Sequence, residues 1–407
     1  MATSPGHPLL NGHVAPGFER VADEFARNFR ERRELGAACA VYLGGEKVVD
    51  LWGGYRDRAR SKPWEEDTLV IVYSTSKGLA AATLALAHSR KFLVYDERVS
   101  NYWPEFAENG KERITVRELL AHQAGLCAID ERLDPTVLAD LDAVAAAIAR
   151  QRPAWEPGTR HGYHGLSLGF YEGELIRRVD PAHRSLGRFF AEEIAAPLGI
   201  EFYFGVPPTV PEERIAQVRS YRRPEVLFHM DVMPRGMVLG FMRRRSLTAR
   251  AFGNPKVRGP ADLNTAEYRA LELASATGVG QARAVAAVYA ELATGGRKLG
   301  YGEETLAELS APPSTPSGGA RDLVLHVETA FSLGFLRPSP LFRFASSDRA
   351  FGHTGAGGSF GFADPDLELG FAYTPNRLGF HLRDDPREKA LRDAVYACIG
   401  ERTPAAA

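Results

Sequence analysis

Apolar positions near the start of the chain first follow a helical repeat and then the pattern of strands. One apolar stripe on an otherwise charged segment predicts a helix that ends near Leu35, and it consists of Phe18, Val21, Ala22, Phe25 and Phe29. After Gly36, residues 37–43 and 47–52 indicate two strands of a hairpin around Gly44-Gly45, since glycine accepts the positive φ of tight turns. A helix followed directly by a hairpin suggests an antiparallel sheet with a helix on one face.

The middle of the chain has a different pattern, because Ala/Leu-rich helical runs dominate from about Gly78 to Ala270. These runs lie at 79–88, 116–122, 137–150, 166–178 and 188–195. A further helix is predicted from 277 to about 295 and a last one over 386–399. Strand-like runs return between them, at 323–327, 330–336, 342–345, 350–354, 359–363 and 369–373.

Strands at both ends of a chain usually belong to one sheet when helices fill the middle. We therefore predict an α+β fold. Residues 1–75 and 271–407 are expected to form a discontinuous sheet domain, and residues 76–270 an inserted all-helical domain.

Charge and composition narrow the function classes. Fifty basic and 51 acidic residues leave a net charge of −1, which gives no electrostatic reason to expect nucleic acid or an anionic membrane as partner. The basic run Arg243-Arg244-Arg245 is interpreted as a solvated loop. Three cysteines are too few for a disulfide framework, and no signal peptide or apolar run of membrane-spanning length is visible. We expect a soluble, cytoplasmic protein.

Ser74 and Lys77 lie where an apolar run gives way to a predicted helix. The segment Ser74-Thr75-Ser76-Lys77 opens that helix, and a spacing of three places both side chains on one face. The lysine could then hydrogen-bond the hydroxyl, and the helix start would favour an oxyanion. The same serine could equally be an ordinary N-cap.

Tyr163 stands between a Pro157-Gly158 loop and the helix predicted from Leu166. A tyrosine beside a cationic lysine can have its pKa lowered enough to act as a general base. Taken alone, Tyr163 is also compatible with a packing role.

Five glycines lie within the ten residues from Gly352 to Gly361, at the end of a strand-like run. Glycine lets a main chain approach another group closely. This group could be an acyl chain along the strand edge, with a main-chain N–H as oxyanion donor. A plain glycine-rich hairpin would have the same sequence.

Together the three segments resemble the serine β-lactamase and penicillin-binding-protein family, above all class C β-lactamases and family VIII carboxylesterases. The family's Ser-x-x-Lys motif is met by Ser74 and Lys77, and the tyrosine of its second motif by Tyr163. Its Lys-Thr-Gly motif falls on His353-Thr354-Gly355. The resemblance spans roughly residues 15–400. It implies a β-lactamase/transpeptidase-like fold, with an antiparallel sheet flanked by terminal helices and the site in the cleft against the helical insertion.

Two departures move the expectation from β-lactams to esters. Class C enzymes have an asparagine two residues after the tyrosine, where this chain has Gly165, and a lysine where it has His353. The resemblance therefore implies a serine hydrolase that cleaves short- to medium-chain carboxylic esters through an acyl-enzyme on Ser74. Lys77 and Tyr163 are expected to share the task of general base.

Further roles follow from the same resemblance. Main-chain N–H groups of Ser74 and Ala356 are expected to form the oxyanion hole, and His353, Thr354 and Gly355 to contact substrate. No metal and no organic cofactor are expected, and the expected partner is a small-molecule ester. Alternatives are an acyltransferase, a peptide cyclase or D-amino peptidase of the same fold, and a non-catalytic binding module. β-Lactamase activity is expected to be weak or absent.

Two other serines and two histidines offer alternative chemistry. Ser167 and Ser359 each fit the G-x-S-x-G pattern of α/β-hydrolases, but neither stands between a predicted strand and a predicted helix as that motif requires. His161 and His164 flank Tyr163, yet no third metal ligand lies at a suitable spacing.

Overall fold

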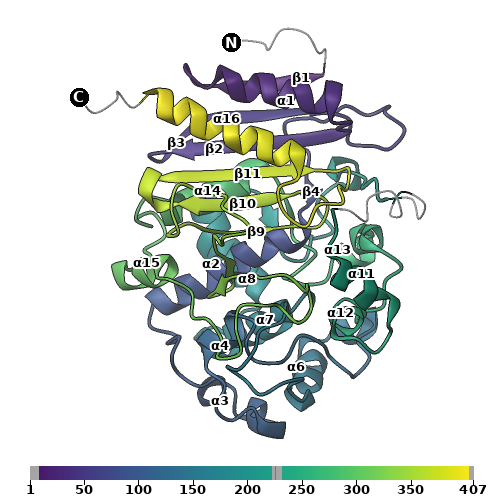
Figure 1. Cartoon of the computed structure of the whole chain (residues 1–407), viewed down its shortest axis with the longest axis vertical. Coiled ribbons are helices and arrows are strands. Elements are labelled where there is room, and N and C mark those ends of the chain that lie inside the picture. Colours follow the sequence, from purple (N-terminus) through teal and green to yellow (C-terminus); the bar gives the residue numbers. More distant parts are fainter. Residues whose placement is uncertain (1–8, 222–224, 226–231, 403–407) are drawn as a thin grey trace.

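The computed structural model describes residues 9–221, 225 and 232–402, and the strands from both ends of the chain form one antiparallel sheet (Figure 1). The strand order is β1-β3-β2-β11-β10-β9-β8-β7. β2 pairs with β11 over seven positions, from Ala37↔Pro375 to Leu43↔Leu369, and so joins the two ends of the chain. The strands are β1 Leu10–Val14, β2 Gly36–Leu43, β3 Glu46–Gly54, β7 Phe331–Ser332, β8 Phe335–Leu336, β9 Phe351–Thr354, β10 Phe360–Asp364 and β11 Leu369–Pro375.

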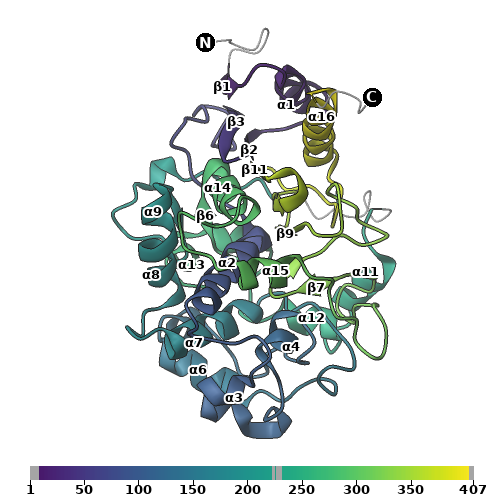
Figure 2. The ribbon, with the colours of Figure 1, turned by 90° about the vertical axis from the view of Figure 1, so that its left-hand side faces the viewer.

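Helices cover both faces of this sheet. The terminal helices α1 (Glu19–Glu31) and α16 (Pro386–Arg402) pack together on the outer face, and α14 (Ala282–Ala293) lies on the inner face (Figures 1 and 2). The inner face is built from small residues, so α14 approaches closely. A Cβ added at Gly370 would lie 2.4 Å from the main-chain nitrogen of Ala290. The predicted sheet with terminal helices is thereby confirmed.

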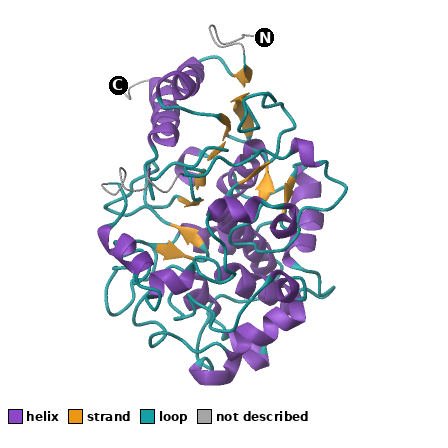
Figure 3. Ribbon diagram, turned by 90° about the vertical axis from the view of Figure 1, so that its right-hand side faces the viewer, coloured by secondary structure: helices purple, strands orange, loops and turns teal. Residues whose placement is uncertain are grey.

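The part of the molecule away from the two termini is mainly helical (Figure 3). Its centre is α2 (Ser76–Ser89), in which every residue from Ser76 to His88 is buried. Because α2 is mostly apolar and buried on every side, other elements surround it completely. The remaining helices are α3 Val99–Tyr102, α4 Val116–Leu120, α5 Pro135–Leu138, α6 Leu141–Arg150, α7 Leu168–Val179, α8 Leu186–Phe190, α9 Ala196–Leu198, α11 Arg235–Met242, α12 Leu247–Ala251, α13 Ala266–Arg269 and α15 Glu303–Ser310.

The structure corrects several of the predicted elements. The inserted region is not purely helical, because β5 (Phe202–Tyr203) pairs with β6 (Val279–Gly280), which also pairs with β4 (Val70–Ile71). Residues 323–327 form a turn instead of a strand, since the buried Asp322 carboxylate accepts hydrogen bonds from Val324 and Leu325 N–H. The predicted helix over 137–150 is two helices, and the predicted strand over 342–345 is a loop.

Two further observations concern membrane-spanning helices and metal sites. No helix of the described residues combines the length and apolarity needed to cross a bilayer. Within the same residues, no group of three or more His, Cys, Asp or Glu side chains is arranged to hold a metal ion.

Candidate active site

Ser74 lies on a sharp turn that leads straight into the central helix. The turn is one 3-10 segment, η1 (Tyr73–Thr75), followed directly by α2. Tyr73 has φ = +50°, a conformation that costs a residue with a side chain about 1–3 kcal/mol. Contacts hold the turn in place, since Val72 N–H donates to Gly278 O at 2.9 Å and Ser76 Oγ donates to Tyr73 O. The Ser74 amide is thus among the first N–H groups of the helical run, which lack partners within the helix.

Lys77 is completely buried and its ammonium group points at Ser74. Lys77 Nζ lies 3.2 Å from Ser74 Oγ, 2.7 Å from Gly165 O and 2.9 Å from Ser275 O. The two carbonyls accept two of its N–H groups. In the neutral amine, the lone pair therefore faces the serine hydroxyl.

The surroundings of Lys77 favour that neutral form. Burial lowers the pKa of Lys77 to about 7. Burial also raises the pKa of Glu172 to about 8, and neither carboxyl oxygen of this fully buried side chain has a hydrogen-bond partner among the described residues. Glu172 is thus largely protonated at neutral pH and gives Lys77 no full counter-charge.

Tyr163 lies over Lys77 at the entrance of the pocket. Lys77 Nζ is 4.8 Å from the centre of the Tyr163 ring. Burial raises the pKa of the phenol, although the Ser74 side chain acts to lower it. The rise is the opposite of the lowering expected from a neighbouring lysine charge. The phenol is therefore protonated at pH 7.

His353 comes from β9 and faces Tyr163, with the ring centroids 5.9 Å apart. Its Nδ1 donates to Thr354 O at 2.7 Å, so Nε2 carries the lone pair. Nε2 is buried and has no hydrogen-bond partner among the described residues. Because burial lowers the pKa of His353 to about 3, the ring is neutral. The neutral His353 thus presents a hydrogen-bond acceptor at the position where class C β-lactamases have a lysine cation.

Gly355 is pressed against the Ser74 turn, which explains why a glycine is needed there. A Cβ at Gly355 would lie 2.2 Å from Ser359 Oγ and 2.3 Å from Val72 O. Ser359 Oγ donates to Val72 O at 2.8 Å and accepts from Thr75 Oγ1 at 3.1 Å. The glycine-rich segment and the Ser74 turn are thereby joined as one unit.

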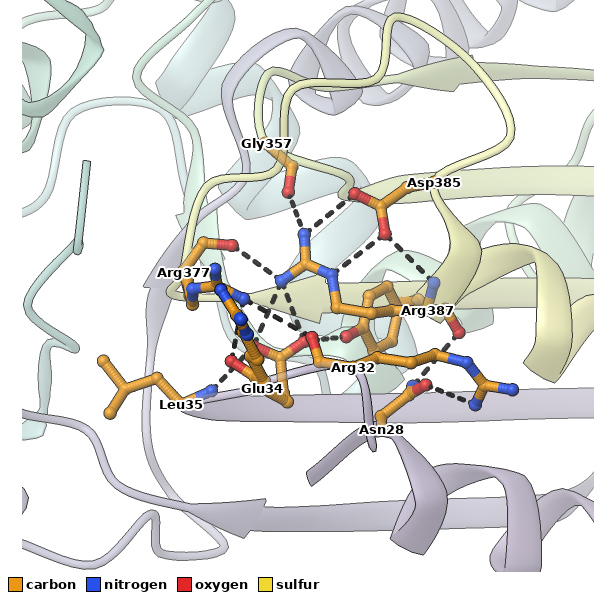
Figure 4. Close-up of polar contacts among 10 residues, drawn as sticks. Asn28, Arg32, Glu34, Leu35, Gly357, Arg377, Asp385 and Arg387 are labelled. Atoms are coloured by element: carbon orange, nitrogen blue, oxygen red, sulfur yellow. Dashed lines mark hydrogen bonds and ion pairs between the residues drawn. The ribbon is translucent and has the colours of Figure 1, made fainter. Parts of the chain in front are cut away.

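Ala356 lies beside Ser74 in the same pocket, and its N–H donates to no main-chain carbonyl of the described residues. The main chain next to it is held by Arg387, whose Nη2 donates to Gly357 O at 2.7 Å (Figure 4). The same guanidinium pairs with Glu34 at 3.0 Å and with Asp385 at 2.9 Å, and all three side chains are buried. This ionic cluster, contributed by both ends of the chain, fixes the loop that carries Ala356.

The pocket in front of Ser74 has a volume of about 160 Å³. Six of the predicted site residues line it, with Lys77 behind them: Ser74, Tyr163, His353, Thr354, Gly355 and Ala356. Its other walls are mostly apolar and include Met237, Phe252, Leu325, Phe331 and Leu336. An apolar wall with a few convergent polar groups is typical of a small-molecule site.

The alternative serines are structural. Ser167 Oγ is buried and donates to Leu126 O at 2.7 Å, and Ser359 Oγ is held as described above. His164 uses both ring nitrogens, with Nδ1 on Gly162 O and Nε2 accepting from Leu126 N–H. None of these groups is free to act as nucleophile or metal ligand.

Some residues of the site have no signal in the sequence. Gly165 and Ser275 act through carbonyl oxygens, which every residue possesses. Asp322 accepts a hydrogen bond from Tyr163 N–H at 3.2 Å and so positions the tyrosine from a distant loop. Phe331 stacks on Tyr163 with ring centroids 5.6 Å apart. Among these residues, only Gly165 is singled out by the sequence, as a departure from the family pattern.

Comparisons with known proteins agree with this geometry. The Beta-lactamase family model matches residues 22–396. The chain is 33% identical over 386 residues to the esterase/beta-lactamase LipL of Mycobacterium tuberculosis, covering 90% of this chain and 83% of that protein. A crystal structure of a family VIII carboxylesterase has a TM-score of 0.84 at 37% identity, with 96% of this chain and 99% of the other covered. A penicillin-binding protein homologue from Caulobacter crescentus has a TM-score of 0.83 at 35% identity, with the same coverage. The protein is therefore an enzyme of the beta-lactamase family, with the fold of the β-lactamase-like hydrolases.

Proposed function

We propose that the protein hydrolyses short- to medium-chain carboxylic esters through an acyl-enzyme on Ser74. One observation carries the proposal. The buried Lys77 amine donates two N–H groups to main-chain carbonyls, and its nitrogen lies 3.2 Å from Ser74 Oγ. The esterase names of LipL and of the family VIII carboxylesterase support the choice of ester as substrate.

In the acylation step, Ser74 Oγ attacks the ester carbonyl as its proton passes to the neutral Lys77 amine. The carbonyl oxygen becomes an oxyanion, which accepts hydrogen bonds from Ser74 and Ala356 N–H, each worth about 3 kcal/mol. When the C–O bond breaks, the Tyr163 phenol gives its proton to the leaving alkoxide, and the Lys77 ammonium returns a proton to the phenolate.

Deacylation repeats the cycle with water. Lys77 takes a proton from the attacking water, and the resulting ammonium gives that proton to the Ser74 oxygen as it leaves the acyl group. Assigning the base to Lys77 and the acid to Tyr163 refines the shared role predicted from the sequence. The two pKa directions support this division.

The pocket supports esters over β-lactams. Its volume of about 160 Å³ and its apolar walls suit a short acyl chain. A Cβ at Gly165 would lie 2.7 Å from the Phe252 ring, so Phe252 fills the space of the family's asparagine side chain. The neutral His353 offers no cation for a β-lactam carboxylate.

The test is hydrolysis of p-nitrophenyl esters of graded acyl length by the wild type and by Ser74→Ala, with nitrocefin as the β-lactam probe. We expect turnover of the shorter esters, its loss in Ser74→Ala, and weak or no cleavage of nitrocefin. Ester turnover that survives in Ser74→Ala would refute the proposal. Ser167→Ala is the matched control and should retain activity.

A further inference from the structure

Most of the large exposed apolar side chains lie on segments that also line the pocket. The large hydrophobic side chains that are exposed among the described residues are Val94, Leu239, Phe241, Met242 and Leu341. The three from 239 to 242 lie on α11, which also supplies Met237 to the pocket wall. The loop tip 341 lies between two other wall residues, 339 and 342. Four of the five exposed side chains thus lie on segments that also supply wall residues of the pocket, and Met242 is 75% exposed.

This surface is continuous with the pocket wall. The ring of Phe241 lies 5.5 Å from that of Phe252, which lines the pocket and lies 6.2 Å from the Tyr163 ring. Figure 2 shows α11, α12 and β7 on the same side of the molecule. Aromatic contacts therefore connect α11 to the pocket wall.

Cationic side chains follow the apolar ones directly. Arg243, Arg244 and Arg245 are all exposed, and none forms an ion pair with a described residue. Arg383 also lines the pocket. One exposed carboxylate, that of Glu328, lines the same pocket. Apolar side chains next to unpaired arginines are the combination by which proteins lie on anionic lipid, because the guanidinium groups bind phosphates while the apolar chains enter the acyl region.

We propose that Leu239, Phe241, Met242 and Leu341, together with Arg243-Arg244-Arg245, form a docking surface for an anionic lipid layer. The surface would place the pocket mouth against the lipid, so that esters dissolved in it reach Ser74; this last step rests on the proposed function. The net charge of −1 gave no hint of such a surface, because it averages over the whole chain. The arginine run is then part of a binding site and not merely solvated.

The experiment is co-sedimentation of the full chain with vesicles of phosphatidylglycerol or phosphatidylcholine, at low and at high salt. We expect binding to phosphatidylglycerol, binding at least about tenfold weaker to phosphatidylcholine, and release at high salt. L239S/M242S and R243Q/R244Q/R245Q should each weaken binding by about tenfold or more. Val94→Ser and R20Q/R188Q/R349Q, which change exposed residues elsewhere, should bind like the wild type.

Turnover of the water-soluble p-nitrophenyl acetate separates this proposal from the proposed function. All these variants should keep it within about twofold, as only the surface is altered. Absence of vesicle binding, or unchanged binding by both test variants, overturns the docking surface even if ester hydrolysis is found. A dimer that dissociates in L239S/M242S would likewise overturn it and assign the surface to a second copy. Vesicle binding without any Ser74-dependent turnover would instead refute the proposed function.

Discussion

Lys77 Nζ lies 3.2 Å from Ser74 Oγ, and the other two hydrogen bonds of this amine go to carbonyl oxygens and not to a carboxylate. An ammonium group without a full counter-charge loses its proton easily, which agrees with the pKa of about 7. This single contact determines how the site should respond to pH and to substitution.

The rate of ester hydrolysis should rise with pH around neutrality. Since the pKa of Lys77 is lowered from 10.5 to about 7, the active neutral amine predominates above pH 7 and the inactive ammonium below it. The kcat/KM for p-nitrophenyl acetate, measured from pH 5 to 9, should have its midpoint near 7. Lys77→Arg, whose guanidinium stays protonated, should lose about 10³-fold or more in kcat. A midpoint near 10 would contradict the neutral amine.

Glu172→Gln should lower that midpoint by less than about one pH unit, because only the partial negative charge of Glu172 raises the pKa of Lys77 against burial. The carboxyl of Glu172 has a pKa raised to about 8, so the wild type already carries a largely neutral group there at pH 7. The amide has the same shape and also no charge. A midpoint that falls by a full unit in Glu172→Gln would mean that the carboxylate is ionised and supports the Lys77 ammonium. The same pH series on both proteins measures this.

Tyr163→Phe should lower kcat by about 10²–10⁴-fold and change KM little, because it removes the proton donor for the leaving alkoxide. The midpoint of the pH profile should stay where Lys77 sets it. The loss should be smaller for esters with p-nitrophenolate, a good leaving group, than for alkyl esters. Equal losses for both kinds of ester would argue against a role as acid.

Gly165→Asn should not create a β-lactamase. The added side chain meets the Phe252 ring, whose nearest atom would be 2.7 Å from the new Cβ. We expect a lower melting temperature and weaker ester hydrolysis, without gain on nitrocefin. Phe252→Ala should relieve this clash, so a double-mutant cycle should show the two changes to be less harmful together than their sum. Strict additivity would mean that the two side chains do not compete for space.

Arg387→Met should destabilise the protein by about 3–5 kcal/mol in urea unfolding, because it leaves the buried Glu34 and Asp385 carboxylates without their partner. It should also lower kcat in the folded protein, since the loop carrying Ala356 loses the hydrogen bond to Gly357 O. Arg349→Met, which breaks an exposed pair with Asp366, is the control and should cost about 0.5 kcal/mol or less. Similar losses of unfolding free energy in both variants would show that the buried cluster stabilises the protein no more than an exposed ion pair does.

The parts of the site that could be predicted are those written in short motifs. Ser74 and Lys77 are three residues apart where the η1 turn runs into α2, and the glycines from 352 to 361 indicate a close main-chain approach directly in the sequence. The apolar walls could not be predicted, because Phe252 and Phe331 reach Tyr163 through the fold and resemble any other buried aromatic residue.

The errors in the fold have similar causes. β1 (Leu10–Val14) is half exposed and lies at the edge of the sheet, so its pattern gave no strand signal. Residues 323–327 are apolar enough for a strand, but the Asp322 carboxylate closes them into a turn. The neighbouring lysine alone predicts a lowered pKa for Tyr163, whereas burial by residues distant in the sequence raises it.

The hydrogen bond from Ser359 Oγ to Val72 O joins positions 287 residues apart along the chain. During synthesis the serine turn leaves the ribosome long before the glycine-rich strand that completes it. Chains that lack the last fifth of the protein therefore contain the serine turn without the strand that completes the pocket. The pocket can close around Ser74 only after nearly the whole chain has been made.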